Sequence, residues 1–258
     1  VHQGTVNMPI SRRASLFLTC SADSLYPSVG RASVRLLESY GVAVDFPEEQ
    51  TCCGQPWLNT GDTKSARTMA LNFLKVFERS EAIVAPSSSC VDTVRNRYLP
   101  LFKGEPKLQD RFRELASKTY EICEYMHCIL DIPKLPPHPE PTRATYHSSC
   151  RTLRGIGLRG VAENYLKQML GDHFVPLPDA DTCCGFGGSF SVKFPEVSGK
   201  MMEDKLVNIV LTGASIVAAL DMSCLTHLSA GARKLNHGRL RFVHLAKLMV
   251  EALEGKMR

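Results

Sequence analysis

Eight of the ten cysteines fall into two sets with matching spacing, and this repeat constrains the fold of the 258-residue chain more than any other feature. Each set has a single cysteine, an adjacent pair and a final single cysteine. The sets are Cys20, Cys52, Cys53 and Cys90, and Cys150, Cys183, Cys184 and Cys224. The second set follows the first by about half the length of the chain, which predicts two copies of one structural unit.

The sequence around the cysteines supports a duplication. Both pairs lie in the tetrapeptide TCCG, after an acidic turn that contains proline. Between the halves, the proline-rich stretch IPKLPPHPEP cannot form a helix or a central strand, so it predicts an extended linker. We therefore predict a first domain over residues 1–131, with 1–14 as a tail, a linker over 132–141 and a second domain over 142–258.

Apolar periodicity predicts alternating strands and helices in each half. The expected helices cover residues 31–40, 64–79, 161–170 and 197–210, and the expected strands before the cysteine pairs cover 42–46 and 174–177. This pattern indicates an α/β fold, made of two tandem Rossmann-like domains with small parallel sheets, related by a pseudo-two-fold axis. Ligands of such sheets bind beyond the carboxyl ends of the strands, where each cysteine set would converge.

Four thiols in each half match the ligand count of tetrahedral zinc or of a four-iron cluster. Adjacent cysteines point apart in an extended chain, which suits a larger cluster better than a single ion. Gly54 and Gly185, which follow the pairs, permit a positive φ and a close approach of the backbone to a bound group. The alternative, ordinary buried cysteines beside turn glycines, does not predict the same arrangement twice.

Together these motifs resemble those of a known family. The segments SLFLTC, DFPEEQTCCGQP, APSSSC, DTCCGFGGSFSVK and ALDMSCL are similar to the cysteine-rich CCG-domain proteins, which include the cysteine-rich subunit of heterodisulfide reductase. The resemblance covers nearly the whole chain from Ser15 onward and is closest to the lactate-utilisation members. It implies one or two [4Fe-4S]-type clusters, of a non-cubane type in some members, with the eight cysteines of the two sets as ligands. It also implies oxidation of L-lactate to pyruvate together with partner subunits.

One departure from the family pattern leaves the type of cluster open. The fuller pattern ends each repeat in Cys-x-x-Cys, but Ser87 and Asp221 stand at the earlier position here. Both residue types favour helix N-caps, so we expect capping ahead of iron ligation. Zinc in one half is an alternative. The chain also lacks a compact ferredoxin-type cysteine run, so a partner subunit with ferredoxin-type clusters, and a third lactate-utilisation subunit, are expected.

Other residues have weaker signals. His147 could bind metal, donate to a thiolate or accept the hydroxyl proton of a small 2-hydroxy acid, which makes it the candidate catalytic residue; a hydrogen-bonded core histidine is the alternative. Arg151 and Lys193 could pair with a substrate carboxylate or simply be solvated. Cys123 and Cys128 are expected as core thiols on one helix. The GIGLRG run at 155–160 imitates a dinucleotide motif, but close packing at a helix start explains it better.

Charge and hydropathy exclude several classes. The net charge of +5 includes no basic block, so no nucleic-acid partner is expected, and no apolar run is long enough for a transmembrane segment. Without a secretory signal we expect a cytoplasmic protein, or one held at the inner face of the membrane by its partners. A zinc-stabilised scaffold without redox activity, and a thiol–disulfide enzyme resembling heterodisulfide reductase, are the alternative functions.

Overall fold

The computed structural model describes residues 13–255. The tail predicted over residues 1–14 falls mostly outside this range, but its last two residues, Arg13 and Ala14, belong to the first strand. That part of the prediction is therefore wrong. Ala14 is buried among the core residues, so pairing of this strand begins earlier than the sequence suggested.

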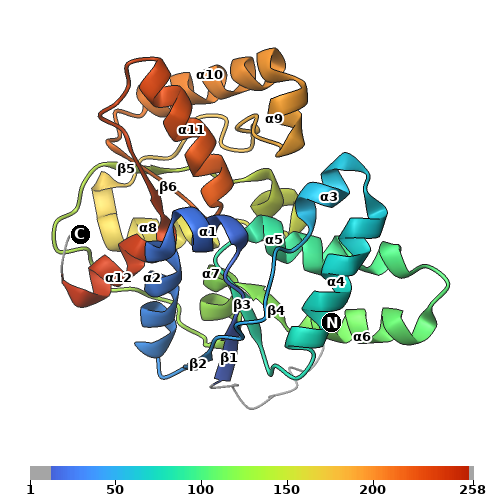
Figure 1. Cartoon of the computed structure of the whole chain (residues 1–258). Coiled ribbons are helices and arrows are strands. Elements are labelled where there is room, and N and C mark those ends of the chain that lie inside the picture. Colours follow the sequence, from blue (N-terminus) through green and yellow to red (C-terminus); the bar gives the residue numbers. More distant parts are fainter. Residues whose placement is uncertain (1–12, 256–258) are drawn as a thin grey trace, which may run out of the picture.

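Two parallel sheets form the centres of the two halves (Figure 1). The first has the order β2-β1-β3-β4 and the second the order β5-β6-β7. The strands are β1 (Arg13–Leu16), β2 (Ala43–Asp45), β3 (Ile83–Ala85), β4 (Thr119–Glu121), β5 (Ala144–Tyr146), β6 (Ile216–Ala219) and β7 (Arg241–His244). Every paired register is parallel, so the predicted class of tandem parallel-sheet α/β domains is confirmed.

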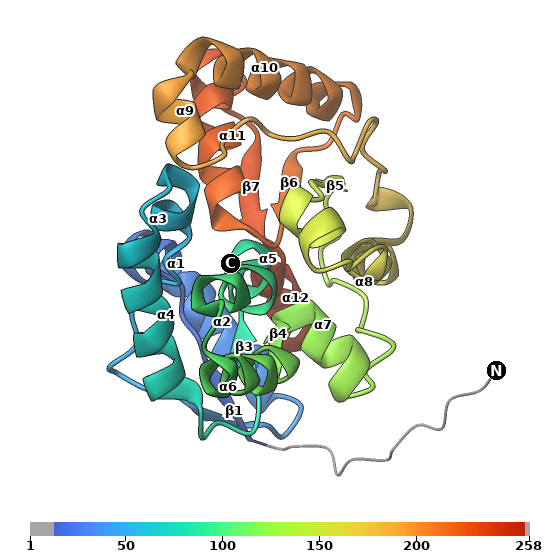
Figure 2. The same ribbon diagram turned by 90° about the vertical axis from the view of Figure 1, so that its right-hand side faces the viewer.

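Crossover helices connect the strands and cover the sheets (Figure 2). In the first half they are α1 (Cys20–Leu25), α2 (Pro27–Glu38), α3 (Gln55–Thr60), α4 (Thr63–Phe77), α5 (Ser88–Asp92), α6 (Pro106–Ser117) and α7 (Ile122–Glu124). In the second half they are α8 (Val161–Leu170), α9 (Ser189–Lys193), α10 (Pro195–Leu211), α11 (Met222–Lys234) and α12 (Leu245–Glu254). Wider π-helical turns lie at Thr93–Arg97 after α5, at Tyr125–Ile129 after α7, and at Arg151–Gly155 directly after Cys150.

One predicted strand does not form. Residues 174–177 make a single bridge to β5, through Phe174 opposite Ala144, and the amide of Val175 donates to the carbonyl of Ala144. Pro176 and Pro178 fix φ at about −65°, well away from the roughly −120° of a parallel strand, and this disfavours an extension of the bridge. The second sheet therefore has one strand fewer than the first, although its chain follows the same path.

One hydrophobic cluster spans both halves. Helix α12, at the end of the second half, packs against α2 of the first half, as Figure 1 shows at its left side. Leu36 and Leu37 from α2 belong to the same buried cluster as Leu248 and Met249 from α12. This packing fixes the relative position of the two sheets and so the geometry of any site between them.

The boundaries of the two domains stay predictions. Residues 132–141 have neither helix nor strand, but the shared core joins the segments on either side of them. Among the residues that the structure describes, no helix is long and apolar enough to cross a membrane.

Candidate metal centres

In each half the four cysteines form a row of neighbouring thiols in the order of the sequence. In the first half, the Sγ atoms of Cys20 and Cys52 are 3.7 Å apart and those of Cys53 and Cys90 are 3.3 Å apart. A hydrogen bond between Cys52 and Cys53 joins these two contacts. We call these four residues the first thiol row. The row runs from the surface into the core: Cys20 is exposed, Cys52 is half-buried, and Cys53 and Cys90 are buried.

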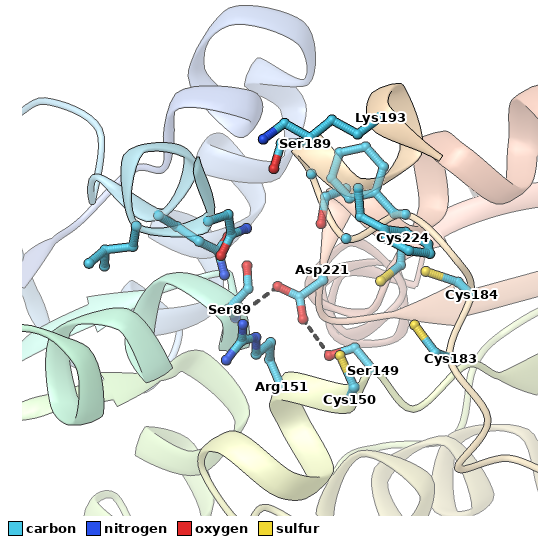
Figure 3. A pocket seen from close by; sticks show the side chains of 18 of the residues that line it. Ser89, Ser149, Cys150, Arg151, Cys183, Cys184, Ser189, Lys193, Asp221 and Cys224 are labelled. Atoms are coloured by element: carbon cyan, nitrogen blue, oxygen red, sulfur yellow. Dashed lines mark hydrogen bonds between the residues drawn. The ribbon is translucent and has the colours of Figure 1, made fainter. Parts of the chain in front are cut away.

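The second half repeats this arrangement. Hydrogen bonds connect Cys150 with Cys183, Cys183 with Cys184, and Cys184 with Cys224. We call these four residues the second thiol row. Figure 3 shows their sulfur atoms gathered on one side of a pocket. All eight cysteines that the sequence singled out therefore converge in two separate groups, beyond the carboxyl ends of the strands.

The strands end earlier than expected, and the cysteines lie at helix starts instead. Strand β1 ends at Leu16 and Cys20 begins α1, while Cys90 lies in the first turn of α5. Cys224 holds the corresponding place in α11. Backbone amides point outward at helix starts, and this favours a thiolate there over a neutral thiol.

The thiols within a row differ in acidity because the first cysteine of each adjacent pair accepts hydrogen bonds from two neighbouring thiols. The pKa of Cys52 is lowered to about 3, first by the hydrogen bond from Cys20 and then by that from Cys53. The pKa of Cys183 is lowered in the same way, first by Cys150 and then by Cys184. In each row these hydrogen bonds favour ionisation of the acceptor thiol, and thiolates are the form that binds metal.

Glycine is required after each pair. Gly54 and Gly185 have φ of +79° and +87°, a region that other residues rarely adopt. The amide of each donates to the sulfur two residues earlier, that of Cys52 or Cys183, over 3.4 Å. A Cβ on Gly185 would lie 2.5 Å from the carbonyl oxygen of Ser198 in α10. The chain therefore turns tightly around the thiols in both halves.

His147 lies beside the second thiol row, in the position that Phe17 holds in the first half. The side chain is buried, but neither ring nitrogen has a hydrogen-bond partner of normal geometry. One ring nitrogen lies within 4.8 Å of the sulfurs of Cys184 and Cys224. A hydrogen bond with Cys184 lowers the pKa of Cys224, and one with the imidazole of His147 helps to lower it, so the catalytic role and the hydrogen-bonded core histidine both stay predictions.

A buried carboxylate joins the two halves next to the second thiol row. Asp221 accepts hydrogen bonds from the Ser87 hydroxyl (2.9 Å), the Ser89 amide (3.0 Å) and the Ser149 hydroxyl (2.5 Å). The expected capping role is confirmed for Ser87, whose hydroxyl accepts from the amide of Cys90. It is wrong for Asp221, which stands at the N-cap of α11 but makes no capping bond. Its oxygens are occupied by the serines of the network.

A cavity of about 550 Å³ opens between the halves and touches all four thiols of the second row. Its walls come from both halves, including Asn59 and Arg97 of the first and Arg151, Phe190 and Lys193 of the second. His147 does not line it, so the histidine lies behind the thiols rather than facing a ligand. The first thiol row faces a different depression of about 330 Å³, lined partly by Cys20 and Cys52.

The donor set fits a thiolate-ligated metal centre in each half. Soft sulfur ligands select zinc, copper(I) or iron–sulfur clusters over magnesium or calcium. All ten cysteines are free, so no disulfide competes for the thiols. The unpartnered nitrogens of buried His147 are a further donor in the second half, where an imidazole next to sulfur suits a metal ligand or a hydrogen bond to one.

Comparison with known proteins decides the family. The sequence profile described as "Cysteine-rich domain" (CCG) matches residues 14–95 and again residues 144–229, one match for each thiol row. The chain belongs to the CCG family. The two matches place the duplicated CCG unit where the cysteine spacing predicted it.

Two relatives that match over nearly their whole length have the same name. Lactate utilization protein A of Halalkalibacterium halodurans is 39% identical over 92% of this chain and 96% of its own length. The protein of the same name from Exiguobacterium is 38% identical over 93% of this chain and 98% of its own length. The predicted resemblance to the lactate-utilisation members is therefore confirmed.

A solved structure shows that the fold recurs. A hypothetical protein from Helicobacter pylori superposes with a TM-score of 0.67 over 96% of this chain and 50% of its own length. Its sequence is 11% identical, so the likeness concerns the fold alone.

Several residues lie away from both rows. Cys123 is a buried core thiol as predicted, but Cys128 is exposed, because five residues along a helix turn a side chain well away from the first. In the dinucleotide-like run, Gly155 packs so closely on Asp92 that a Cβ would lie 2.7 Å from its Cγ, which supports the close-packing interpretation.

Sequence reasoning missed two groups beside the second thiol row. Arg97 lies in a π-helical turn, outside any repeated motif, and only its charge could have drawn attention to it. Lys205 of α10 is buried, and its ammonium group donates to the carbonyl of Asp179 over 2.7 Å. This hydrogen bond holds the turn before Cys183 in place. The position of Lys205 in the helical pattern of the sequence did not indicate this contact.

Proposed function

We propose that this protein is an iron–sulfur electron-transfer subunit that takes part in the oxidation of L-lactate to pyruvate. The observation that carries the proposal is the pair of equivalent four-thiol rows, one in each CCG unit. The names of the whole-length relatives support lactate utilisation as the process. A cytoplasmic location, with attachment to a membrane only through partners, is part of the same proposal.

The reaction sets what the chain must do. Conversion of a 2-hydroxy acid to a 2-oxo acid releases two electrons and two protons. A four-iron cluster bound by a thiol row would accept and pass on single electrons. The electrons must then leave to a partner subunit with further clusters, which we propose as the immediate acceptor, with a third lactate-utilisation subunit in the same complex.

The residues of the chain have separate roles in this proposal. The eight cysteines of the two rows would hold the clusters, and Gly54 and Gly185 let the backbone approach them. His147 would bind or donate to sulfur in the second centre, because it lies behind the thiols and away from the cavity. A direct role in taking a proton from the substrate is not favoured by this position.

Zinc is the second candidate because of the sulfur spacing. Zinc–sulfur bonds of about 2.3 Å in a tetrahedron place the sulfurs about 3.8 Å apart. The contacts of 3.3 and 3.7 Å in the first thiol row are close to that value, although no three ligand atoms of that row lie within 4.8 Å of one another. A zinc-stabilised scaffold would use the same ligands without any redox change.

Anaerobic purification followed by metal and sulfide analysis separates the two candidates. Iron with acid-labile sulfide, visible absorption and a paramagnetic reduced state are expected. Cys53→Ser and Cys184→Ser should each remove one centre and leave the other intact. Cys123→Ser, at a buried thiol outside both rows, is the matched control and should leave both. Zinc alone, in a colourless protein that dithionite does not change, would refute the redox proposal.

A further inference from the structure

The two thiol rows face surroundings of opposite charge. The depression beside the first row is lined by the carboxylates of Asp23 and Glu48 and by no basic side chain. The cavity beside the second row is lined by Arg97, Arg151 and Lys193, with Asp221 as its acidic residue. An anionic ligand is therefore repelled at the first row and attracted at the second.

The acidic residue of the cavity does not cancel this attraction. Asp221 is almost fully buried, and its two oxygens already accept hydrogen bonds from two serine hydroxyls and one amide. Its charge is therefore largely satisfied within the wall. Arg151 is paired with Asp92 over 2.6 Å, so it too is occupied.

Two cations remain available for a ligand. The guanidinium group of Arg97 donates to a neutral partner, the side-chain oxygen of Asn59, over 3.0 Å. Partial burial lowers the pKa of Arg97, and the nearby charge of Arg151 lowers it further. Lys193 makes no hydrogen bond or ion pair within the part of the chain that the structure describes. Both cations thus lie in the wall of the cavity without a carboxylate of their own.

The remaining lining fits a small hydroxylated acid. Ser89, Ser149 and Ser189 supply hydroxyl groups, and Phe186 and Phe190 supply an apolar wall. Figure 3 shows the four thiols on one side of Asp221, with Ser89 on the other side and the Lys193 side chain crossing above. A ligand in this space would have its carboxylate near the cations and its carbon chain near the thiols.

An outer groove extends the positive surface. It is lined by Arg97, Arg151 and Arg154 with one carboxylate, that of Asp92, which pairs with Arg151, and it shares Cys150 with the cavity. Anions arriving at the boundary between the halves therefore meet arginines before they reach the thiols. The excess of positive charge over the single carboxylate raises the rate at which an anionic ligand arrives.

We propose that this cavity binds the carboxylate of a small 2-hydroxy acid between Arg97 and Lys193, which come from opposite halves, and that the second thiol row is the centre facing the substrate. The identity of the acid rests on the proposed function. The negative charge of the ligand is inferred from the cavity lining alone. The first thiol row, with its exposed Cys20, is then free to face the electron-accepting partner.

Calorimetric titration of the anaerobically purified protein tests the site. L-lactate and pyruvate should bind, whereas lactamide, which lacks the carboxylate charge, should not. Arg97→Gln and Lys193→Gln should each weaken binding of pyruvate by about tenfold or more, with unchanged metal and sulfide content. Lys200→Gln is the matched control, because Lys200 is exposed and paired with Asp204 outside the cavity.

The outcomes distinguish this inference from the proposed function. Carboxylate binding that depends on Arg97 and Lys193 in a protein without iron would support the site and refute the redox role. Iron centres that reduce normally, together with unchanged carboxylate affinity in both variants, would overturn the site alone. Equal affinity for inorganic phosphate and pyruvate would refute the carboxylate preference.

Discussion

The hydroxyl of Ser87 donates a 2.9 Å hydrogen bond to the carboxylate of Asp221, and the two residues hold equivalent positions in the two halves, three residues before Cys90 and Cys224. At the positions where the family resemblance implied a cysteine in each repeat, this chain has a donor and an acceptor that bond to each other. The repeats are thus joined next to the second thiol row by the very residues that depart from the pattern.

Asp221→Ala should destabilise the protein strongly. It would leave the amide of Ser89 and the hydroxyls of Ser87 and Ser149 buried without their acceptor. Loss of one member of a buried charged network costs about 3 kcal/mol or more. Urea unfolding should show this loss, whereas Asp204→Ala, which removes an exposed ion pair with Lys200, should cost less than about 1 kcal/mol. Equal effects of the two substitutions would mean that the network contributes little.

Gly185→Ala should disrupt the second metal centre. The new Cβ would lie 2.5 Å from the carbonyl oxygen of Ser198 and 3.0 Å from the Cβ of Met201, so the turn after Cys184 must move. We expect the variant to lose about half of the bound metal. Gly61→Ala is the matched control, because Gly61 also has a positive φ but nothing within 4 Å of a new Cβ. It should cost only backbone strain, about 1 kcal/mol, and keep its metal.

The sequence predicted the repeat, the fold class and the cysteines that come together, because these depend on spacing and on periodicity within short segments. The paired prolines that limit the Phe174 bridge are visible in the sequence, but apolar periodicity outweighed them. The Ser87–Asp221 bond could not be foreseen, since it joins residues from different repeats. The positive cavity has the same origin, because Arg97 and Lys193 line one cavity only when the two halves pack together, as they do through α2 with α12 and α3 with α9.

Stability should fall as the pH drops from 7 to 5 because of His244. Burial lowers the pKa of this side chain to about 4, and hydrogen bonds to the carbonyls of Leu220 and Pro86 only partly oppose that. Asp221 also raises this pKa and Lys247 lowers it. Because the folded pKa lies below that of an unfolded histidine, about 6.5, the unfolded state binds more protons in this window. The neutral imidazole's contribution is complete above pH 6.5 and is lost toward pH 4.

Urea unfolding at the two pH values measures the effect. Between pH 7 and pH 5 the wild type should lose about 2 kcal/mol through this group. His244→Asn should remove most of that dependence, while His173→Asn, at an exposed position, should keep it. A His244→Asn protein that loses as much stability as the wild type over this range would assign the dependence to other groups.

His147→Phe should make the metal-free protein more stable, although it replaces a residue beside the second thiol row. Both nitrogens of His147 are buried without a hydrogen bond of normal geometry, and a contact with the Cys224 thiol only partly offsets the cost of about 1–3 kcal/mol for such a group. Phenylalanine already holds the corresponding position in the first half, where Phe17 packs against Phe73 with ring centroids 4.8 Å apart. We expect a gain of about 1–2 kcal/mol in the free energy of unfolding after metal removal.

The reciprocal change and a smaller side chain control for packing. Phe17→His should cost about 3 kcal/mol, since it introduces polar atoms into an aromatic core. His147→Leu avoids overfilling the site if phenylalanine is too large. In the metal-loaded protein the same His147 variants should alter the spectrum of the second centre and leave the first unchanged. If both His147 variants unfold more readily than the wild type without metal, the imidazole has a stabilising partner, and its role is structural rather than directed at the metal.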